Sequence, residues 1–333
     1  MGHGNLALAR EYFSDIKTFD DRIGTLMALD APLKRLYSMR GKPNAEGAIA
    51  HNRQGFVSIA YQRYALDLVI YGIAANDMSF LKHGVNGIRY GFTKQAVNGS
   101  FEVSFLSRRK TDIGKRLSNA ALFLTSAAIS YQLIHHSPYR RRFLKQLMEI
   151  RLGIRRTVYW LAKNDLKLFL HDQDSAYHLL NDALAYIVCG EIYNNITLIK
   201  RGHIFLEIAL ELQRKDGAFL EYEGHDSSCQ ASNIVLMTYY MLFVQNRGYF
   251  NRVLRAIAMG LIWEKTRVLP TGKVNSRNNT RRIQTYSTFS GRQSDINYSE
   301  VVKAFLWYGF FTGDKQSRFL ARRVFQFITK RST

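Results

Sequence analysis

The sequence predicts an all-α protein in which antiparallel helical hairpins follow one another. Three observations predict this: apolar residues recur with the period of a helix, strand-like alternation is scarce, and Pro is only 4 of 333 residues. Apolar residues make up 47% of the chain, which is typical of a globular protein and too high for a disordered one. The length suits one large domain or two small ones. We expect a single domain over residues 1–333, with 1–53 as a less regular first hairpin and linker.

Six pairs of amphipathic segments follow one another along the chain. In the clearest pair, Tyr177, Leu180 and Leu184 fall on one stripe after Ser175, a residue suited to the N-cap, and a second helix follows over about 198–213. The other pairs are 6–17 with 22–36, 55–75 with 78–94, 113–134 with 139–163, 231–245 with 249–265, and 298–311 with 315–328. The irregular spacing argues against a strict repeat array. Two architectures remain: an open solenoid, or an (α/α)6 toroid, a ring with an inner and an outer layer of helices.

Long loops favour the toroid over the solenoid. Segments 38–54, 214–229 and 267–297 have no helical pattern, and loops longer than about 12–15 residues are usually functional or disordered. In a toroid such loops gather at one end and build a cleft. We therefore predict an all-α, (α/α)6-toroid-like ring of antiparallel helical hairpins.

The charge of the chain indicates an anionic partner. There are 47 Lys and Arg and 26 Asp and Glu, a formal net charge of +21. This balance favours binding to nucleic acid, an anionic membrane surface or an acidic polysaccharide, and does not choose among them. The stretches 117–139 and 227–246 lack Asp, Glu, Lys and Arg but carry polar residues throughout, so we expect buried helices and no membrane span.

The cysteine count and the first residues limit the class further. Only Cys189 and Cys229 are present, which excludes a disulfide scaffold and a CxxC zinc or redox site. We expect no metal and no cofactor. The first residues lack the pattern of a signal peptide, so we expect a cytoplasmic protein, or a secreted or periplasmic one if a leader has been removed.

The loop at 214–229, RKDGAFLEYEGHDSSC, concentrates groups that can transfer protons. Asp216-Gly217 is a turn signal that ends the preceding helix. Two interpretations of residues 221–228 stay open. In the structural one, Asp226, Ser227 or Ser228 caps the next helix and His225 is an ordinary loop residue. In the functional one, Tyr222 or His225 transfers a proton and Asp226 orients it.

The loop at 267–297 is basic and rich in asparagine. Its guanidinium groups suit carboxylate, sulfate or phosphate, and Asn278 and Asn279 could orient sugar hydroxyls. The alternative is a solvated basic loop. Elsewhere, His178 and Asn181 share a helix face near Asp172, Asp174 and Asp182. They either reach a cleft or form a cap and a polar core pair.

Other features are less specific. The helix around Arg140–Arg156 is strongly basic, which favours a solvated or polyanion-contacting face over a dedicated nucleic-acid reader. The chain lacks GxGxxG, GxSxG, HExxH and P-loop motifs. Dinucleotide redox chemistry, α/β-hydrolase chemistry, zincin proteolysis and P-loop nucleotide hydrolysis therefore lack their usual signatures.

Part of the chain resembles a known group of proteins. Asp216-Gly217, Glu221-Tyr222 and Gly224-His225-Asp226-Ser227-Ser228-Cys229-Gln230 resemble a DGxFxExxGxDxxYQ-like stretch that opens an inner helix in α/α-toroid carbohydrate-active proteins, the polysaccharide lyases and six-hairpin glycosidases. Segments 271–274, 278–281 and 297–301 resemble the entry to the next hairpin of that group. The resemblance covers about 176–330. Cys229 stands where that pattern has Tyr, and the chain lacks the Asn-His pair common in toroid uronate lyases.

The resemblance implies a polysaccharide-degrading enzyme, and the charge favours an acidic, uronate-containing substrate. Our first expectation is a lyase acting by β-elimination: Arg281 with Asn278 or Asn279 neutralises the uronate carboxylate, and Tyr222 and His225 act as acid and base. The alternatives are an inverting-type glycoside hydrolase using Asp226 with Glu221 or Glu223, or a non-catalytic glycan- or nucleic-acid-binding protein. The expected partner is an acidic polysaccharide or oligosaccharide, ahead of nucleic acid. The predicted substrate-binding residues are Glu221, Glu223, Gln230, His178, Asn181, Asn278, Asn279, Arg281, Arg282 and Tyr298.

Overall fold

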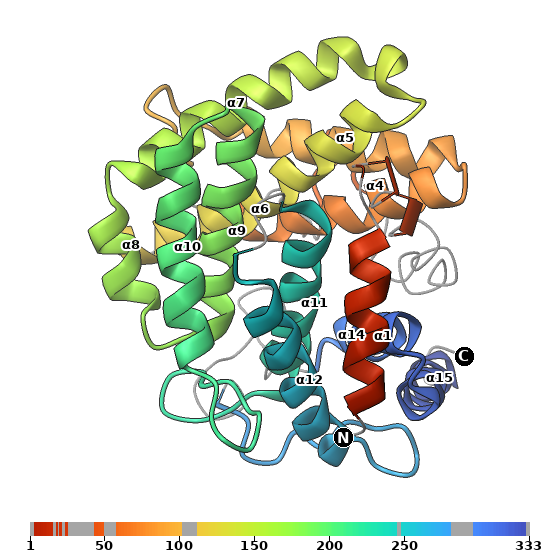
Figure 1. Ribbon diagram of the computed structural model, residues 1–333. Coiled ribbons are helices and arrows are strands. Elements are labelled where there is room, and N and C mark those ends of the chain that lie inside the picture. The colour runs from red at the N-terminus through yellow and green to blue at the C-terminus, as the bar shows by residue number, and fades with distance from the viewer. Residues whose placement is uncertain are drawn as a thin grey trace. The chain divides into compact units, whose positions relative to one another are not determined.

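The computed structural model describes residues 3–15, 18, 20–21, 24–25, 43–49, 58–101, 112–244, 248–280 and 296–330. Within these ranges the chain is all-helical, with isolated bridges and no extended strand, as Figure 1 shows. The expectation of an all-α fold is confirmed. The chain divides into two compact units. The first comprises Met1–Thr18, Asp174–Leu180 and Glu207–Thr333, and the second comprises Phe19–Gln173 and Asn181–Leu206.

The second unit is built around one long helix. This helix, α6, contacts five other elements of the unit, and most of its residues are buried. Its N-cap is Asp112, whose side chain accepts from the N–H groups of Gly114 and Lys115. The elements are η2 (Ile59–Tyr64), α4 (Ala65–Ala74), α5 (Met78–Thr93), α6 (Ile113–His136), η3 (Arg140–Phe143), α7 (Leu144–Ala162) and α8 (Asp165–Asp172), followed by most of α9 (Ala176–Ile192) and α10 (Ile196–Glu211).

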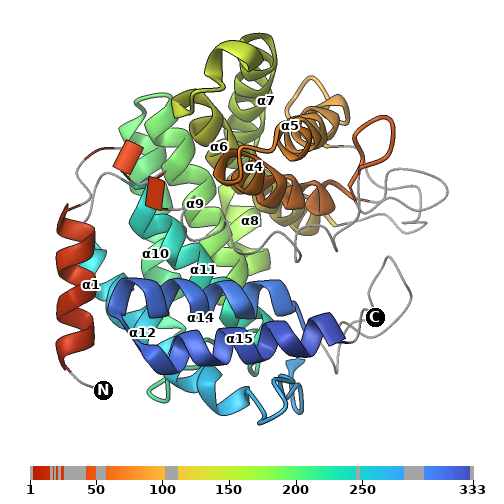
Figure 2. The ribbon, with the colours of Figure 1, turned by 90° about the vertical axis from the view of Figure 1, so that its right-hand side faces the viewer.

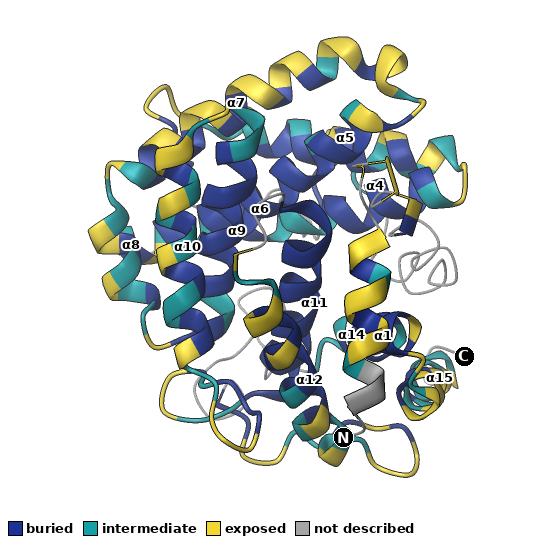
Figure 3. Cartoon of the chain, viewed as in Figure 1, coloured by how far each residue is buried: buried dark blue, intermediate teal, exposed yellow. Residues whose placement is uncertain are grey.

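The first unit is likewise built around a buried helix, α11. Every residue of α11 is buried, which explains why this stretch carries no charge; Figure 3 shows it dark along its length. It packs against α12 and α14, and α14 pairs with α15 in a hairpin visible in Figure 2. The helices are α1 (His3–Asp15), α11 (Ser227–Phe243), α12 (Phe250–Arg267), α14 (Tyr298–Thr312) and α15 (Lys315–Lys330).

One helix of the described chain is long and apolar enough to cross a membrane. This is α6, whose most apolar window is 94% buried inside the protein. A core helix passes the same test of length and composition. The described residues therefore give no clear membrane span.

A seven-residue turn occurs three times in the described part of the chain, at 95–101, 213–219 and 268–274. In each, the first and seventh residues form an isolated bridge. The fifth residue is a glycine with φ of 91°, 94° and 86° at Gly99, Gly217 and Gly272. A Cβ atom there would lie 2.2, 2.1 and 2.3 Å from the backbone oxygens of Arg156, Met259 and Arg323. Glycine is required at these positions, because a side chain would overlap the second helix of the next hairpin.

Two of these turns begin with a glutamine, and each glutamine fixes its turn at the same place on the helix that the turn contacts. The amide of Gln95 donates to the carbonyl of Gly153 at 2.9 Å, and that of Gln213 donates to the carbonyl of Ala256 at 2.8 Å. Both acceptors lie three residues before the carbonyl that the turn glycine approaches. The hairpins of the two units are thus attached to the preceding turn by the same device.

The predicted hairpins are confirmed from residue 59 onwards, with shifted boundaries. Segment 231–245 is a helix from Ser227, because Asp226 caps it, and segment 55–75 includes a 3-10 turn before α4. The short helix α8 was not predicted. Of the helix predicted at 22–36, only residues 24–25 are described, and both are helical; the rest lies outside the described residues. The choice between toroid and solenoid, and the single domain over 1–333, stay predictions.

Candidate functional site

The loop that follows Gly217 is fixed to the start of α11 by one side chain. Gln230 accepts from the N–H of Phe219 at 2.8 Å and donates to the carbonyls of Gly217 and Gly260, both at 3.1 Å. Both of its amide hydrogens therefore bond to backbone. Gln230, predicted to bind substrate, holds the loop at residues 217–219 in place.

Glu221 is buried within the same loop and fully hydrogen-bonded. It accepts from the hydroxyl of Ser175 at 2.6 Å, the N–H of Tyr177 at 2.9 Å and the amide of Asn233 at 3.4 Å. Burial, with a smaller contribution from the charge of Asp226, raises the pKa of the Glu221 carboxyl to about 7, although these hydrogen bonds act to lower it. This carboxyl is poised to hold or release a proton near neutral pH.

Asp226 is the N-cap of α11. Its Oδ1 accepts from the N–H groups of Ser228 at 2.9 Å and Cys229 at 3.0 Å, and the residue is 2% exposed. The geometry therefore matches the capping interpretation of the sequence. The catalytic role predicted for Asp226 stays a prediction.

The two long loops of the sequence meet at this helix start. The carbonyl of His225 accepts from both the N–H and the hydroxyl of Thr280, at 2.9 and 3.1 Å. Ser227 donates to the side chain of Asn279 at 3.3 Å, and Ser228 accepts from the N–H of Asn297 at 2.8 Å. We call residues 221–228, 275–280 and Asn297 the loop junction.

Arg267, the last residue of α12, holds the loop junction together. Its guanidinium donates to the carbonyls of Asn275 at 2.9 Å and Arg277 at 2.7 Å, and to the hydroxyl of Ser227 at 3.4 Å. It also lies over the ring of Trp263, 5.4 Å from the centroid. A permanent cation is thus fixed beside His225 and Ser227.

His225 offers an imidazole nitrogen without a partner. Its ring lies edge-on to Trp263 with 5.1 Å between centroids, and Nε2 is covered and makes no hydrogen bond to any residue that the structure describes. Burial lowers the pKa of His225, and the charges of Arg267 and Arg214 lower it further. The imidazole is therefore neutral at pH 7 and able to accept a proton.

Glu264 is a buried carboxyl that the sequence interpretation missed. It is 0% exposed, and neither of its oxygens has a hydrogen-bond partner in the described chain. Burial raises its pKa well above the usual value; the charge of Arg267 opposes this effect, and the charge of Asp226 adds to it. The signal that could have found it is its position on the apolar stripe of α12, in register with Ile257 and Leu261.

The remaining predicted residues of the first unit differ in exposure. Tyr222 adopts a left-handed backbone conformation with φ of 57° and has 39% of its surface exposed, beside the exposed Glu223. Asn279 is buried in the loop junction, whereas Asn278 is exposed. Tyr298 packs against Phe327, and His178 lies beside Tyr177.

Three further predicted residues lie either in the second unit or outside the described residues. Asn181 belongs to the second unit, where it is buried and its carbonyl accepts from the Thr125 hydroxyl at 2.8 Å. Arg281 and Arg282 lie outside the described residues. The predicted role of these two arginines in binding a carboxylate stays a prediction.

A buried acid pair occupies the core of the second unit. Asp172 and Asp182 are each 1% exposed, and His171 Nδ1 lies 2.8 Å from Asp172 Oδ1. Burial raises the pKa of Asp182 well above its usual value, and the charge and hydrogen bond of Asp172 add to the effect. These surroundings favour the protonated, neutral form of the Asp182 carboxyl.

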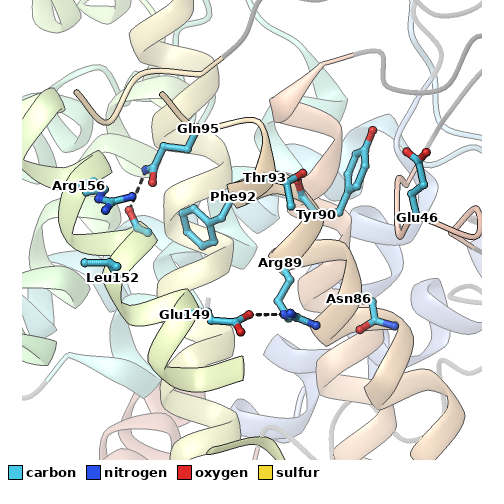
Figure 4. Close-up of a pocket in the computed structure, with 11 residues that line it drawn as sticks. Glu46, Asn86, Arg89, Tyr90, Phe92, Thr93, Gln95, Glu149, Leu152 and Arg156 are labelled. Atoms are coloured by element: carbon cyan, nitrogen blue, oxygen red, sulfur yellow. Dashed lines mark hydrogen bonds and ion pairs between the residues drawn. The ribbon is translucent and has the colours of Figure 1, made fainter. Parts of the chain in front are cut away.

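The second unit also carries an open pocket, shown in Figure 4. It has a volume of about 420 Å³ between α5 and α7. Arg89 and Glu149 face each other across it and form an ion pair of 2.7 Å. No residue that we predicted to bind substrate lines this pocket, whose main polar lining consists of Glu46, Asn86, Arg89, Thr93, Glu149 and Arg156.

No group of three or more His, Cys, Asp or Glu side chains that could hold a metal ion occurs among the residues described. Comparisons of the chain with family models, with curated proteins and with solved structures found no match.

Proposed function

We propose that this chain is a polysaccharide lyase that cleaves an acidic, uronate-containing polysaccharide by β-elimination at the loop junction. One observation carries the proposal. His225 presents a neutral imidazole with an unpartnered Nε2, held beside the fixed cation Arg267. A neutral base in positive surroundings is what abstraction of a proton next to a carboxylate requires.

The proposed reaction uses two groups of the loop. His225 Nε2 takes the proton from C5 of the uronate, the C5–H electron pair forms the C4–C5 double bond, and the C4–O bond breaks. The phenol of Tyr222, exposed three residues earlier, gives a proton to the leaving oxygen. Because Nε2 lies under protein atoms, the proposal requires that substrate binding uncovers it.

The charges of the loop junction support an anionic substrate. Arg267 and Arg214 both lower the pKa of His225, so their positive potential reaches the imidazole. The same potential stabilises the negative charge that develops on the uronate as C5 loses its proton. Arg281 and Arg282 keep their proposed role as further ligands of the substrate carboxylate.

We also propose that the hairpins belong to an (α/α)6-toroid-like ring. The support is the recurrence of one turn at 95–101, 213–219 and 268–274, each contacting the second helix of the following hairpin. A repeated attachment places successive hairpins in equivalent positions, as a ring of hairpins requires. Fold and reaction are separate proposals, because one fold hosts several chemistries.

A second candidate function rests on Glu221. Its pKa of about 7 suits a general acid, and the charge of Asp226 contributes to that shift. A glycoside hydrolase needs such a pair of carboxyl groups on either side of the bond that it cleaves. We place hydrolysis second, because both carboxyls already bond to the loop and the helix start.

A degradation panel tests the proposal and separates the candidates. The purified chain is incubated with acidic and neutral polysaccharides while ultraviolet absorbance and reducing ends are followed. We expect both signals to rise together on an acidic substrate, because elimination creates a C4–C5 double bond at each new end. New ends without absorbance would assign the chain as a hydrolase, and no change across the panel would favour a binding protein.

Two variants with matched controls test the residues. We expect His225→Gln and Tyr222→Phe each to lower the rate by about 10²–10⁴. His83→Gln on α5 and Tyr159→Phe on α7 make the same chemical changes in the second unit and should keep the full rate. Full activity of both loop variants on a substrate that the wild type degrades would overturn the assignment.

A further inference from the structure

The exposed side of α7 combines positive charge with apolar side chains. Eight Lys and Arg but only one acidic residue lie between Arg140 and Lys163. The single acid, Glu149, is paired with Arg89 of α5. We define the α7 outer face as Leu144, Lys145, Met148, Arg151, Leu152, Arg155 and Tyr159.

Four large apolar residues of this face are open to solvent. Leu144, Met148 and Leu152 follow one another at intervals of four residues, so they lie on one stripe, and Tyr159 continues it. Their exposed fractions are 50%, 74%, 50% and 41%. The opposite side of the helix already supplies core residues such as Ile150, Ile154 and Val158. Single exposed leucines are ordinary, but an exposed stripe along a helix marks an interaction surface.

The cations of the α7 outer face have no acidic partner among the described residues. Arg151 lies over the ring of Tyr193 and Arg155 over that of Tyr159, and neither these two nor Lys145 forms an ion pair there. Their charges are therefore available to an external anion. Figure 3 shows α7 as mostly exposed on its outer side.

This combination fits an anionic lipid surface better than a soluble polyanion. Nucleic acid and acidic polysaccharide offer charge but little apolar surface for Leu144, Met148 and Leu152. A helix with apolar residues flanked by Lys and Arg lies in a membrane interface, where the apolar residues enter the acyl boundary and the cations meet the headgroups.

We infer that the α7 outer face binds the surface of an anionic lipid bilayer, with Met148 at the centre of the inserted stripe and Lys145, Arg151 and Arg155 at the headgroups. Binding of this kind is peripheral and needs no membrane-spanning helix. It is independent of the reaction proposed at the loop junction, because it is measured without a substrate.

Vesicle flotation tests the inference with the full chain. The probes are vesicles of phosphatidylcholine alone and vesicles of phosphatidylcholine with phosphatidylglycerol. We expect binding to the second kind only, because a basic residue near an anionic surface raises partitioning about fivefold. Equal binding to both kinds, or binding to neither, would overturn the inference.

Variants with matched controls locate the surface. We expect Met148→Glu and the pair Arg151→Glu with Arg155→Glu to lower partitioning by about tenfold or more. Ile204→Glu on α10, which is 60% exposed, and the pair Lys315→Glu with Arg318→Glu on α15 make equal charge changes elsewhere. They should stay within about threefold of the wild type. Loss of binding in all four variants alike would show attraction by net charge alone and would contradict the inference.

A fluorescent label separates insertion from simple charge attraction. Both native cysteines are buried, so Met148→Cys can be labelled selectively with an environment-sensitive dye. We expect a blue shift with anionic vesicles and none with duplex DNA, and no shift in either case for a label at Ile204→Cys. Binding to DNA that is weakened by the arginine variants, with no blue shift on anionic vesicles, would overturn the lipid assignment in favour of a nucleic-acid surface.

Discussion

Two buried glutamates of the first unit have opposite surroundings. Glu221 receives three hydrogen bonds, from Ser175, Tyr177 and Asn233, whereas Glu264 receives none in the described chain. Burial raises the pKa of both, and the charge of Asp226 raises both further. The difference teaches that Glu221 holds a loop in place, whereas Glu264 lowers the stability of the fold. Measurements of stability on variants of both residues test this distinction.

The strongest change is expected on loss of Glu221. Glu221→Ala leaves a hydroxyl, a backbone N–H and an amide without their acceptor, at about 1–3 kcal/mol for each buried group. We expect the free energy of unfolding, measured by urea titration, to fall by about 4 kcal/mol. Glu223→Ala, an exposed neighbour, should change it by less than about 0.5 kcal/mol. A loss below about 1 kcal/mol for Glu221→Ala would show that the three bonds do not hold the loop.

The next effect is a dependence of stability on pH. The pKa of Glu221 is about 7 in the folded chain and near 4.5 ordinarily, so the folded state binds the proton more tightly. Its contribution to stability is complete below about pH 4.5 and is lost as the pH rises through about 7, a change on the order of 3 kcal/mol. Glu221→Gln should remove this part of the slope when urea midpoints are compared across that pH range.

Asp226→Asn is the control for this pH dependence. Asparagine caps a helix as well as aspartate, so the bonds to Ser228 and Cys229 are kept. Removing the charge should lower the pKa of Glu221 and move the loss of stability to lower pH. An unchanged pH profile in both variants would assign the slope to other groups, such as the Asp172–Asp182 pair.

A weaker effect is expected at Glu264 and has the opposite sign. Glu264→Leu removes a buried carboxyl without partners and fills the site with carbon, so we expect a gain of about 1–2 kcal/mol in the free energy of unfolding. Glu264→Gln, which keeps a polar group, should bring no such gain. A loss of stability in Glu264→Leu would show that the carboxyl is structural after all. If Glu264→Leu gains stability but loses activity, the Glu264 carboxyl takes part in the reaction.

The sequence predicted the helices well because their amphipathic periods are long and regular. It also predicted the turn at Asp216-Gly217 and the capping residues before α11. It did not predict α8, because the break at Asn164 interrupts an otherwise continuous pattern by only a few residues. The order of the hairpins could be predicted because each hairpin depends on neighbouring residues. Closure of a ring could not, because it depends on contacts between residues that are distant in sequence.

The sequence predicted which residues lie at the candidate site, but not what each of them does there. Sequence spacing alone could not show that Glu221 turns inward while Glu223 stays exposed, because this depends on the left-handed conformation of Tyr222 between them. Nor could it show that Gln230 bonds to backbone. Glu264 was missed because one acid in an amphipathic helix is usually solvated, and only its register with Ile257 and Leu261 indicates burial.

The glycine turns have a consequence for the order in which the chain folds. Each one joins residues only about 40 to 60 positions apart, so no attachment has to wait for the far end of the chain. Contacts this local favour rapid folding. As the chain leaves the ribosome, a hairpin can lock onto the preceding turn as soon as its second helix emerges. Assembly of these hairpins can then proceed stepwise from the N-terminal side. Helix α1 must wait, because its Phe13 contacts Phe250 of α12 and Phe311 of α14.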